Sequence, residues 1–304
     1  MPKVILTDKL DQIVVDKLTE AGFEVKVAWD LPKEEIPNII GEYDGIVIRS
    51  ATKMKGELLE KATAMKVIVR AGVGLDNVDV ETAMKKGIKV FNTPTATTNS
   101  VAELALALIM SSSRNVVKGT MKVRSDPASY NKFKKELFAN EIDGKVLGII
   151  GTGNIGTSLA KKAKALGMKT IGYDAFQTVN DSIELKPLED VFKESDYISL
   201  HLPLTPETKN VISDAQFGLM KQGVVIVNCA RGGIVDEEAA FKALESGKMA
   251  CYATDVFEKE PPEADNKLLT HENVIITPHI GAQTKEGNYR ASLDSIDKMI
   301  EAFQ

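Results

Sequence analysis

The sequence predicts an α/β protein with two parallel β-sheets. Two observations support this class. Short runs rich in Val and Ile recur at intervals of roughly 20 residues, and helical patterns fill the intervals. Strands of parallel sheets are buried on both faces, so continuous apolar runs are expected there. The predicted strands lie at Val4–Leu6, Glu24–Val27, Gly45–Ile48, Val67–Val69 and Lys89–Phe91, and then at Val146–Ile150, Lys169–Tyr173, Tyr197–Leu200, Val224–Val227 and Val274–Ile276.

These strands form two series, which favours two domains over one very wide sheet. The first series ends near Thr93-Pro94, and the next strand begins only at Val146. Between them lie an apolar helix, Val101–Met110, and a segment rich in lysine and serine, Lys118–Lys145. Such a polar segment is typical of a connection or a subunit arm.

The last helix of the chain is amphipathic, with one apolar stripe formed by Leu293, Ile296, Ile300 and Phe303. We expect this helix to return to the first domain and leave that domain discontinuous. The expected domains are therefore residues 1–98 plus 285–304, and residues 99–284.

Composition excludes several classes of protein. The net charge of −5 over 304 residues argues against broad nucleic-acid binding. No apolar stretch approaches the roughly 20 residues of a membrane helix, and Asp8 interrupts any signal peptide. Cys229 and Cys251 are too few for a disulfide framework. We therefore expect a cytoplasmic protein with neither nucleic acid, membrane nor metal as a partner. The net charge does not argue against a small anionic substrate, because such a site needs only two or three local cations.

The sharpest motif is Gly151-Thr152-Gly153-Asn154-Ile155-Gly156, which follows a predicted strand and opens a predicted helix. In a dinucleotide-binding turn, Gly151 would permit the tight turn and Gly153 would let the backbone approach the pyrophosphate. Gly156 would bring the helix close to the sheet, with its first N–H groups facing the phosphates. The alternative interpretation is an ordinary glycine turn.

Asp174 ends the next predicted strand, 18 residues after Gly156. A carboxylate there can accept hydrogen bonds from the ribose 2′-hydroxyl and would repel a 2′-phosphate. No arginine follows in Ala175-Phe176-Gln177 to hold that phosphate. The motif therefore favours NAD over NADP.

Three histidines are candidates for acid–base chemistry. His201 and His279 each follow a predicted strand, whereas His271 lies in a polar turn before one. Ligands of open α/β sheets bind at the carboxyl ends of the strands, which disfavours His271. The pattern alone ranks neither of the other two, and a structural role is open for both.

Arg231 and Glu260 are the remaining candidates. Arg231 follows the strand Val224–Val227 and is flanked by Gly232-Gly233, which leaves room for a ligand carboxylate beside the guanidinium. The alternative for Arg231 is a solvated residue in a helix-capping loop. Taken alone, Glu260 reads as a solvated loop charge.

Taken together, these segments resemble the D-isomer-specific 2-hydroxy-acid dehydrogenases from about residue 3 to residue 295. The resemblance depends on a combination of motifs: Val69-Arg70-Ala71-Gly72-Val73-Gly74-Leu75-Asp76-Asn77-Val78-Asp79, Asn99-Ser100-Val101-Ala102-Glu103, the glycine turn, His201-Leu202-Pro203-Leu204-Thr205, Asn228-Cys229-Ala230-Arg231-Gly232, Asp255-Val256-Phe257-Glu258-Lys259-Glu260-Pro261 and Thr277-Pro278-His279-Ile280-Gly281.

The resemblance implies a catalytic trio of Arg231, Glu260 and His279. His279 would act as general acid in reduction and general base in oxidation. Glu260 would orient His279, and Arg231 would bind the substrate carboxylate and carbonyl. His201 would instead lie in a loop along the cofactor, and Asp255 would bind the nicotinamide amide. Further implied NAD contacts are Asn154, Ile155, Pro203, Thr208, Cys229, Ala230 and Gly281.

The family pattern also implies two Rossmann-like or flavodoxin-like domains, an active-site cleft between them, hinge closure and a homodimer. Val73 and Gly74 would offer backbone N–H groups to the substrate carboxylate. Arg49 and Ser50, in Arg49-Ser50-Ala51-Thr52-Lys53, resemble the basic loop of members that take a phosphorylated substrate. Arg49 could equally be a surface residue.

The chain departs from the family pattern in two places. Thr97 stands where many relatives have Asn, which puts a substrate contact from that side chain in doubt. The sequence ends at Gln304, so we expect no C-terminal regulatory domain. Lys134 and Lys135 lie where relatives often carry a cation.

Three alternatives remain at this point. A hydroxypyruvate or glyoxylate reductase and a D-lactate-type dehydrogenase belong to the same family. A non-catalytic, NAD-sensing corepressor would keep the fold and bind protein partners instead.

Overall fold

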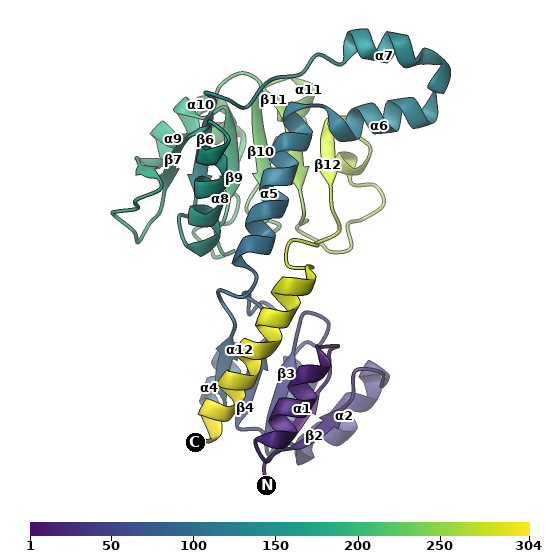
Figure 1. The fold of residues 1–304 in the computed structure, drawn as a ribbon, viewed down its shortest axis with the longest axis vertical. Coiled ribbons are helices and arrows are strands. Elements are labelled where there is room, and N and C mark those ends of the chain that lie inside the picture. Colours follow the sequence, from purple (N-terminus) through teal and green to yellow (C-terminus); the bar gives the residue numbers. More distant parts are fainter. The chain divides into compact units, whose positions relative to one another are not determined.

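The computed structural model describes residues 1–304, which divide into two compact units (Figure 1). The terminal unit comprises Met1–Thr98 and Ala282–Gln304, and the central unit comprises Asn99–Gly281. Each unit contains one sheet whose strands are all parallel. The predicted α/β class with two parallel sheets is confirmed.

The sheet of the terminal unit has the strand order β2-β1-β3-β4-β5. Its strands are β1 (Lys3–Leu6), β2 (Glu24–Val27), β3 (Gly45–Ile48), β4 (Val67–Arg70) and β5 (Lys89–Asn92). Strand β2 is added on one side of β1, and β3, β4 and β5 are added on the other side, so the strand order reverses between β1 and β3. In open parallel sheets, ligands bind outside the carboxyl ends of the strands at such a reversal.

Helices cover both faces of this sheet. They are α1 (Gln12–Glu20), η1 (Lys33–Glu35), α2 (Ile36–Ile39), η2 (Ile40–Glu42), α3 (Gly56–Lys61), α4 (Val80–Lys85) and α12 (Lys285–Phe303). The C-terminal helix α12 packs against α1 and β4 and buries Ile296 and Met299 with Val4 and Leu6. A Cβ on Gly45 would lie 2.8 Å from the Met299 sulfur, so glycine allows this close packing.

The sheet of the central unit has the order β12-β11-β10-β9-β6-β7-β8, with a reversal between β6 and β9. The sequence does not predict two of its strands, β8 and β11; the sequence of β11, Met-Ala-Cys-Tyr-Ala-Thr, contains no Val or Ile. The strands are β6 (Val146–Ile150), β7 (Lys169–Tyr173), β8 (Glu184–Leu185), β9 (Tyr197–Leu200), β10 (Val224–Asn228), β11 (Met249–Thr254) and β12 (Val274–Ile276).

The helices of the central unit are α5 (Thr98–Ser113), α6 (Val116–Ser125), η3 (Pro127–Ser129), α7 (Tyr130–Glu136), α8 (Asn154–Ala165), α9 (Leu188–Glu194), α10 (Asp214–Leu219), α11 (Glu237–Glu245) and η4 (Lys267–Leu269). Helix α5 packs with α8 on one face of the sheet. Helices α6 and α7 extend away from the sheet as an arm (Figure 1). No helix is long and apolar enough to cross a membrane.

Candidate active site

The glycine motif forms the turn from β6 into α8. Gly151 has φ +94°, and a Cβ there would lie 2.5 Å from the carbonyl oxygen of His201. A Cβ on Gly156 would lie 2.3 Å from the Gly151 oxygen. A Cβ on Gly153, in contrast, would meet no atom within 4 Å. Two glycines therefore permit internal packing, and the third leaves open space at the first turn of α8, which suits a pyrophosphate.

Asp174 follows β7 beside this turn. Its Oδ2 accepts a 2.8 Å hydrogen bond from the Thr152 N–H, and Oδ1 accepts hydrogen bonds from the N–H groups of Phe176 and Gln177. Burial acts to raise the pKa of Asp174, but these hydrogen bonds outweigh it and hold the pKa below its usual range. The carboxylate is therefore a fixed negative charge at the turn.

The imidazole of His279 is paired with the carboxylate of Glu260. His279 follows β12 and Glu260 lies in the loop after β11, and their Nδ1 and Oε2 atoms are 2.7 Å apart. The other carboxylate oxygen, Oε1, accepts a 3.2 Å hydrogen bond from the Phe257 N–H. Glu260 therefore fixes the ring of His279 through Nδ1, and Nε2 is the nitrogen left for proton exchange.

Asp255 holds the loop that carries His279. Its side chain is buried, and Oδ1 accepts hydrogen bonds from the Thr277 hydroxyl (2.5 Å) and the Ile280 N–H (2.9 Å). Oδ2 accepts from the Gly281 N–H at 2.8 Å, and the Asp255 carbonyl accepts from the His279 N–H. His279 has φ +54°, a left-handed conformation that costs a non-glycine residue about 1–3 kcal/mol. The contacts of Asp255 offset that cost.

Arg231 lies in the loop after β10, which Asn228 shapes. The buried Asn228 donates from Nδ2 to the Arg231 carbonyl at 3.0 Å and accepts from the Ala230 N–H through Oδ1. A Cβ on Gly232 would lie 1.9 Å from the Phe257 oxygen, so this loop packs against the segment leading to Glu260. The proposed trio thus comes from the carboxyl ends of three neighbouring strands, β10, β11 and β12.

The other two histidines have different surroundings. His201 follows β9, and its Nε2 lies 2.9 Å from the Ser199 hydroxyl, whereas its Nδ1 is buried without a partner. Burial lowers the pKa of His201 to about 4. His271 precedes β12, at the amino edge of the sheet, where its Nε2 lies 3.2 Å from Glu245. Only His279 combines a strand-end position with an exposed ring and a carboxylate partner.

The remaining predicted cofactor contacts also lie in segments that follow the carboxyl ends of strands of the central sheet. Thr208 donates its hydroxyl to the Pro203 carbonyl at 2.6 Å and so closes the loop after His201. Asn154 and Ile155 begin α8, and Gly281 ends the loop held by Asp255. Cys229 and Ala230 are buried. Burial raises the pKa of the Cys229 thiol, which keeps it protonated and unreactive.

The predicted substrate residues Arg49, Ser50, Val73 and Gly74 lie in the terminal unit, after β3 and β4. The guanidinium of Arg49 donates from Nη2 to Asn288 at 2.7 Å. The Val73 carbonyl accepts from Asn92, whereas the N–H groups of Val73 and Gly74 donate no hydrogen bond within the chain. Those two groups are thus available to an anion. Thr97 is buried, and Lys134 and Lys135 are exposed on α7.

Sequence reasoning missed the side chains that hold these loops, namely Asp8, Asn77 and Asn228. Asp8 and Asn77 anchor the Arg49 loop, and Asn228 anchors the Arg231 loop. A polar residue at or just after the end of an apolar strand was the available signal for Asp8 and Asn228. Asn77 lies in a turn and offers no such signal.

Comparison with known proteins identifies relatives of this arrangement. A family model described as "D-isomer specific 2-hydroxyacid dehydrogenase, NAD binding domain" matches residues 106–281. The chain is 46% identical to D-3-phosphoglycerate dehydrogenase of Methanocaldococcus jannaschii over 296 residues, or 96% of this chain and 55% of the relative. It is 43% identical to hydroxypyruvate reductase of Thermotoga maritima, over 98% of this chain and 97% of the relative.

The chain therefore spans about half the length of the first of these relatives and nearly all of the second. Among solved structures, D-lactate dehydrogenase of Aquifex aeolicus, complexed with NAD and lactic acid, superposes with a TM-score of 0.82 at 30% identity. That match covers 99% of this chain and 95% of the other. An acyclic imino acid reductase in complex with NADPH and D-Arg superposes with a TM-score of 0.88 at 26% identity, over 99% and 96% of the two chains.

Proposed function

The chain belongs to the D-isomer-specific 2-hydroxyacid dehydrogenase family, and from this premise we propose that it interconverts D-3-phosphoglycerate and 3-phosphohydroxypyruvate with NAD. This reaction would serve serine biosynthesis. The observation that carries the chemistry is the 2.7 Å contact between His279 and Glu260. The observation that favours a phosphorylated substrate is the anchored Arg49 loop of the terminal unit.

The acid–base step is assigned to His279. In reduction, protonated Nε2 donates its proton to the substrate carbonyl oxygen, and in oxidation the neutral ring takes the hydroxyl proton. Glu260 holds the ring through Nδ1 and stabilises its charged form. Arg231, in its anchored loop, would bind the substrate carboxylate and polarise the carbonyl.

The glycine turn and Asp174 would hold the dinucleotide. Bound NAD supplies the nicotinamide ring that accepts or gives the hydride. The fixed charge of Asp174 would disfavour a 2′-phosphate, so we infer a preference for NAD over NADP. The loop from Pro203 to Thr208, together with Cys229, Ala230 and Gly281, would line the cofactor.

Two groups of the terminal unit would recognise the anionic ends of the substrate. Arg49 and Ser50 would contact the phosphate, and the N–H groups of Val73 and Gly74 would contact the carboxylate. The similarity to phosphoglycerate dehydrogenases supports this assignment. The similarity to hydroxypyruvate reductase over almost its full length favours reduction of the unphosphorylated keto acid as the second candidate.

A substrate panel tests the assignment. We expect 3-phosphohydroxypyruvate to be reduced with a lower KM than hydroxypyruvate, glyoxylate or pyruvate, followed through NADH absorbance. Arg49→Met should raise KM for the phosphorylated substrate roughly 10- to 100-fold, the effect of losing a charge-assisted hydrogen bond, with hydroxypyruvate little changed. Lys26→Met, at an exposed position of β2 in the same unit but outside this loop, is the control. Equal KM values for the two hydroxypyruvates would favour the second candidate, and no turnover of any keto acid would favour a non-catalytic role.

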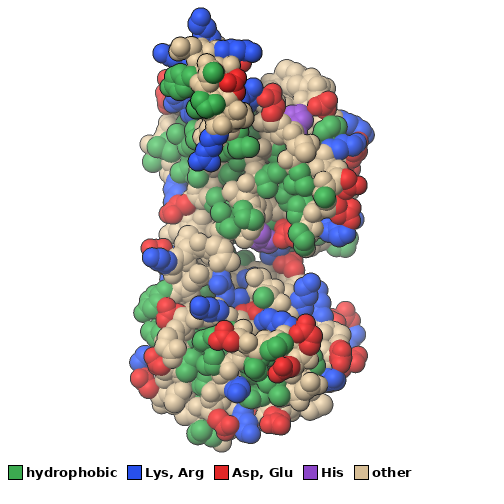
Figure 2. Space-filling view, turned by 90° about the vertical axis from the view of Figure 1, so that its right-hand side faces the viewer, with side chains coloured by type: hydrophobic (Ala, Val, Ile, Leu, Met, Phe, Trp, Pro, Cys, Tyr) green, Lys and Arg blue, Asp and Glu red, His purple; other side chains and the backbone are tan.

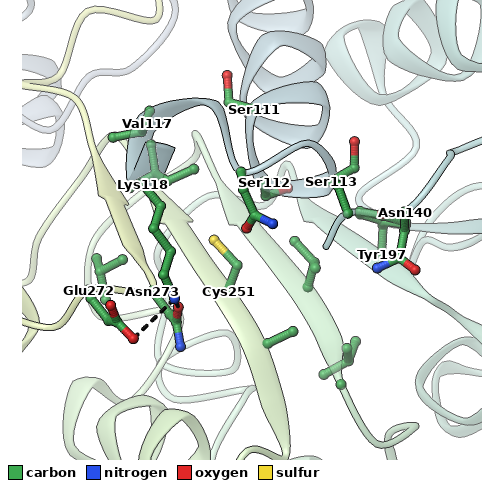
Figure 3. A pocket seen from close by; sticks show the side chains of 18 of the residues that line it. Ser111, Ser112, Ser113, Val117, Lys118, Asn140, Tyr197, Cys251, Glu272 and Asn273 are labelled. Atoms are coloured by element: carbon green, nitrogen blue, oxygen red, sulfur yellow. Dashed lines mark hydrogen bonds and ion pairs between the residues drawn. The ribbon is translucent and has the colours of Figure 1, made fainter. Parts of the chain in front are cut away.

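We also infer a homodimer formed through the arm. Large apolar side chains are exposed on and beside α6 and α7, including Met121 (64%), Tyr130 (58%) and Phe138 (89%). Figure 2 shows apolar side chains on this arm and on the face below it. A cavity of about 740 Å³ lies beneath the arm, with Lys118, Cys251 and Asn273 among its lining (Figure 3). Exposed apolar patches of this kind mark protein interfaces.

The dimer has a direct test. Met121→Lys together with Phe138→Lys should convert the dimer to a monomer in light scattering, whereas Met84→Lys, an exposed methionine of the terminal unit, should not. We infer a cytoplasmic location as well, because the two cysteines are unpaired and buried.

A further inference from the structure

A buried carboxylate lies behind the Arg49 loop. Asp8 follows β1 by two residues, is only 5% exposed, and lies at the reversal point between β1 and β3. Its Oδ2 accepts hydrogen bonds from the N–H groups of Arg49 (2.7 Å) and Thr52 (3.0 Å). Its Oδ1 accepts from the Thr52 hydroxyl (2.7 Å) and from the Lys33 ammonium (2.8 Å). Asp8 therefore fixes both ends of the turn from residue 49 to residue 52.

Asn77 holds the same turn from its other side. Its Nδ2 donates to the carbonyls of Arg49 (2.7 Å) and Thr52 (2.6 Å). Between these two anchored residues, the N–H groups of Ser50 and Ala51 donate no hydrogen bond within the chain. Successive unpaired N–H groups on a fixed turn form an anion-binding concavity. The Arg49 side chain extends from the same turn, and its guanidinium donates to Asn288 at 2.7 Å.

The charge of Asp8 would oppose an anion at this turn if it stood alone. Lys33 compensates for it: the ammonium donates to the Thr7 carbonyl (2.6 Å) and the Thr52 hydroxyl (3.0 Å) as well as to Asp8. An ammonium has three N–H donors, so these contacts occupy all of them. Lys33 is therefore committed to the loop and is not positioned as a ligand for the substrate.

We propose that Asp8 and Lys33 are a pair of positioning residues that determine specificity for a phosphorylated substrate. Asp8 shapes the turn so that the N–H groups of Ser50 and Ala51 and the Arg49 guanidinium face one anion, and Lys33 cancels the charge of Asp8. The inference rests on the proposed function, in which this turn binds the phosphate.

The chain contains a matched control at the opposite, amino ends of the strands of the same sheet. Asp44 precedes β3, where its Oδ2 accepts from the Lys3 N–H (2.8 Å) and its Oδ1 pairs with Lys66 (2.9 Å). This pair also joins a carboxylate to a backbone N–H and a lysine, but at the amino ends of the strands. Asp44→Asn and Lys66→Met therefore measure the structural cost of losing such a pair without touching the anion turn.

Steady-state kinetics test the proposal. Asp8→Asn and Lys33→Met should each raise KM for 3-phosphohydroxypyruvate about tenfold, as expected for weakened charge-assisted contacts, with kcat little changed. The kcat/KM for hydroxypyruvate should stay within about twofold, because that substrate carries no phosphate. The effect of Lys33→Met should shrink as salt screens the uncompensated Asp8, and Lys33→Arg should restore KM. Asp44→Asn and Lys66→Met should alter none of these values.

Three kinetic results would overturn the proposal: no KM change for the phosphorylated substrate, an equal KM change for both substrates, or the same changes in Asp44→Asn. Lys33→Met alters no residue of the turn and provides the test if Asp8→Asn does not fold. Competitive inhibition by inorganic phosphate against hydroxypyruvate separates this proposal from the proposed function. If wild type does not turn over the phosphorylated substrate, a raised inhibition constant for phosphate in Asp8→Asn but not Asp44→Asn still supports the pair. An unchanged constant, or no inhibition of wild type, overturns it.

Discussion

Nδ1 of His279 lies 2.7 Å from Oε2 of Glu260, although the two residues belong to loops that follow different strands. The pairing predicts opposite pH dependences for the two reaction directions. Oxidation of the hydroxy acid requires a neutral ring and should rise with pH, whereas reduction requires a protonated ring and should fall. Initial rates of NADH formation and consumption from about pH 6 to about pH 10 measure both limbs.

His279→Gln should lower kcat by roughly 10²- to 10⁴-fold in both directions and remove the pH dependence assigned to the ring. Glu260→Gln should lower kcat less, because the amide can still contact Nδ1 but orients the ring less firmly than the carboxylate does. His271→Gln, at the amino edge of the sheet, is the control and should leave both profiles intact. Unchanged rates and profiles in His279→Gln would refute the assignment.

The class of fold was accessible from the sequence because parallel strands are continuously apolar, as in Val224–Val227 and Val146–Ile150. Strand β11, Met249–Thr254, does not follow this pattern, because its buried positions hold Met, Cys, Tyr, Ala and Thr and no Val, Ile or Leu. Its pairing with β10 and β12 makes it a central strand. Propensity is a weak guide where neighbouring strands decide the structure.

The candidate active site could be predicted from the sequence only in part. Strand ends pointed to both His201 and His279, and the residues alone could not rank them. The structure separates their surroundings: His201 is buried against Ser199, whereas His279 is half exposed and paired with Glu260. That pair joins loops 19 residues apart, and no periodicity encodes such a contact. The contacts of Asp8 with Arg49 and Thr52 span more than 40 residues and are equally invisible in the sequence.

Asp255 offers a second prediction. Asp255→Asn replaces one carboxylate oxygen by an NH₂ group, which cannot accept the hydrogen bonds that Oδ1 or Oδ2 now receives. The loop from Thr277 to Gly281 should then hold His279 less firmly, and kcat should fall about 10- to 100-fold, as for one or two lost bonds to a charged group. Rapid-reaction kinetics and hydrogen exchange of residues 277–281 measure the effect.

The dissociation constant of NADH distinguishes the two roles open to Asp255. A fall in kcat with little change in that constant would identify loop positioning as the main role. A large rise in the constant with normal exchange of the loop would instead favour the nicotinamide contact that the family resemblance implies. Thr277→Val is the comparison variant, because it removes only one donor to Oδ1.

Two substitutions in the glycine turn should have different effects: one should lower the stability of the fold, and the other should weaken NAD binding. Gly156→Ala places a Cβ 2.3 Å from the Gly151 oxygen and 2.9 Å from Ile149, so the fold itself should lose roughly 1–3 kcal/mol from overpacking. Gly153→Ala adds a Cβ that touches nothing, at φ −63°, and should leave the melting temperature nearly unchanged. The same Cβ would obstruct the approach of a pyrophosphate and weaken NAD binding. Thermal melts and NAD titrations of the two variants should therefore diverge, and strong NAD binding by Gly153→Ala would count against the turn as the phosphate site.

His201 predicts an acid-sensitive component of stability. Burial lowers the pKa of His201 from 6.5 to about 4 in the folded chain, whereas the unfolded chain keeps the ordinary value. Between these values the unfolded state binds more protons, so the free energy of unfolding should fall as the pH drops from about 6.5 toward about 4. The full contribution is present above pH 6.5 and amounts to about 3 kcal/mol, since one pKa unit corresponds to about 1.4 kcal/mol.

His201→Gln lacks a group that titrates in this range and should flatten that part of the profile, whatever its stability at neutral pH. Urea unfolding at several pH values from about 7 to about 4.5 provides the comparison, read as the difference between wild type and variant. His271→Gln serves as the control because His271 precedes β12, at the amino ends of the strands and away from the glycine turn. If the free energy of unfolding depended on pH in the same way in wild type and His201→Gln, the prediction would be wrong. The His201 ring would then take up its proton in the folded chain as readily as in the unfolded chain.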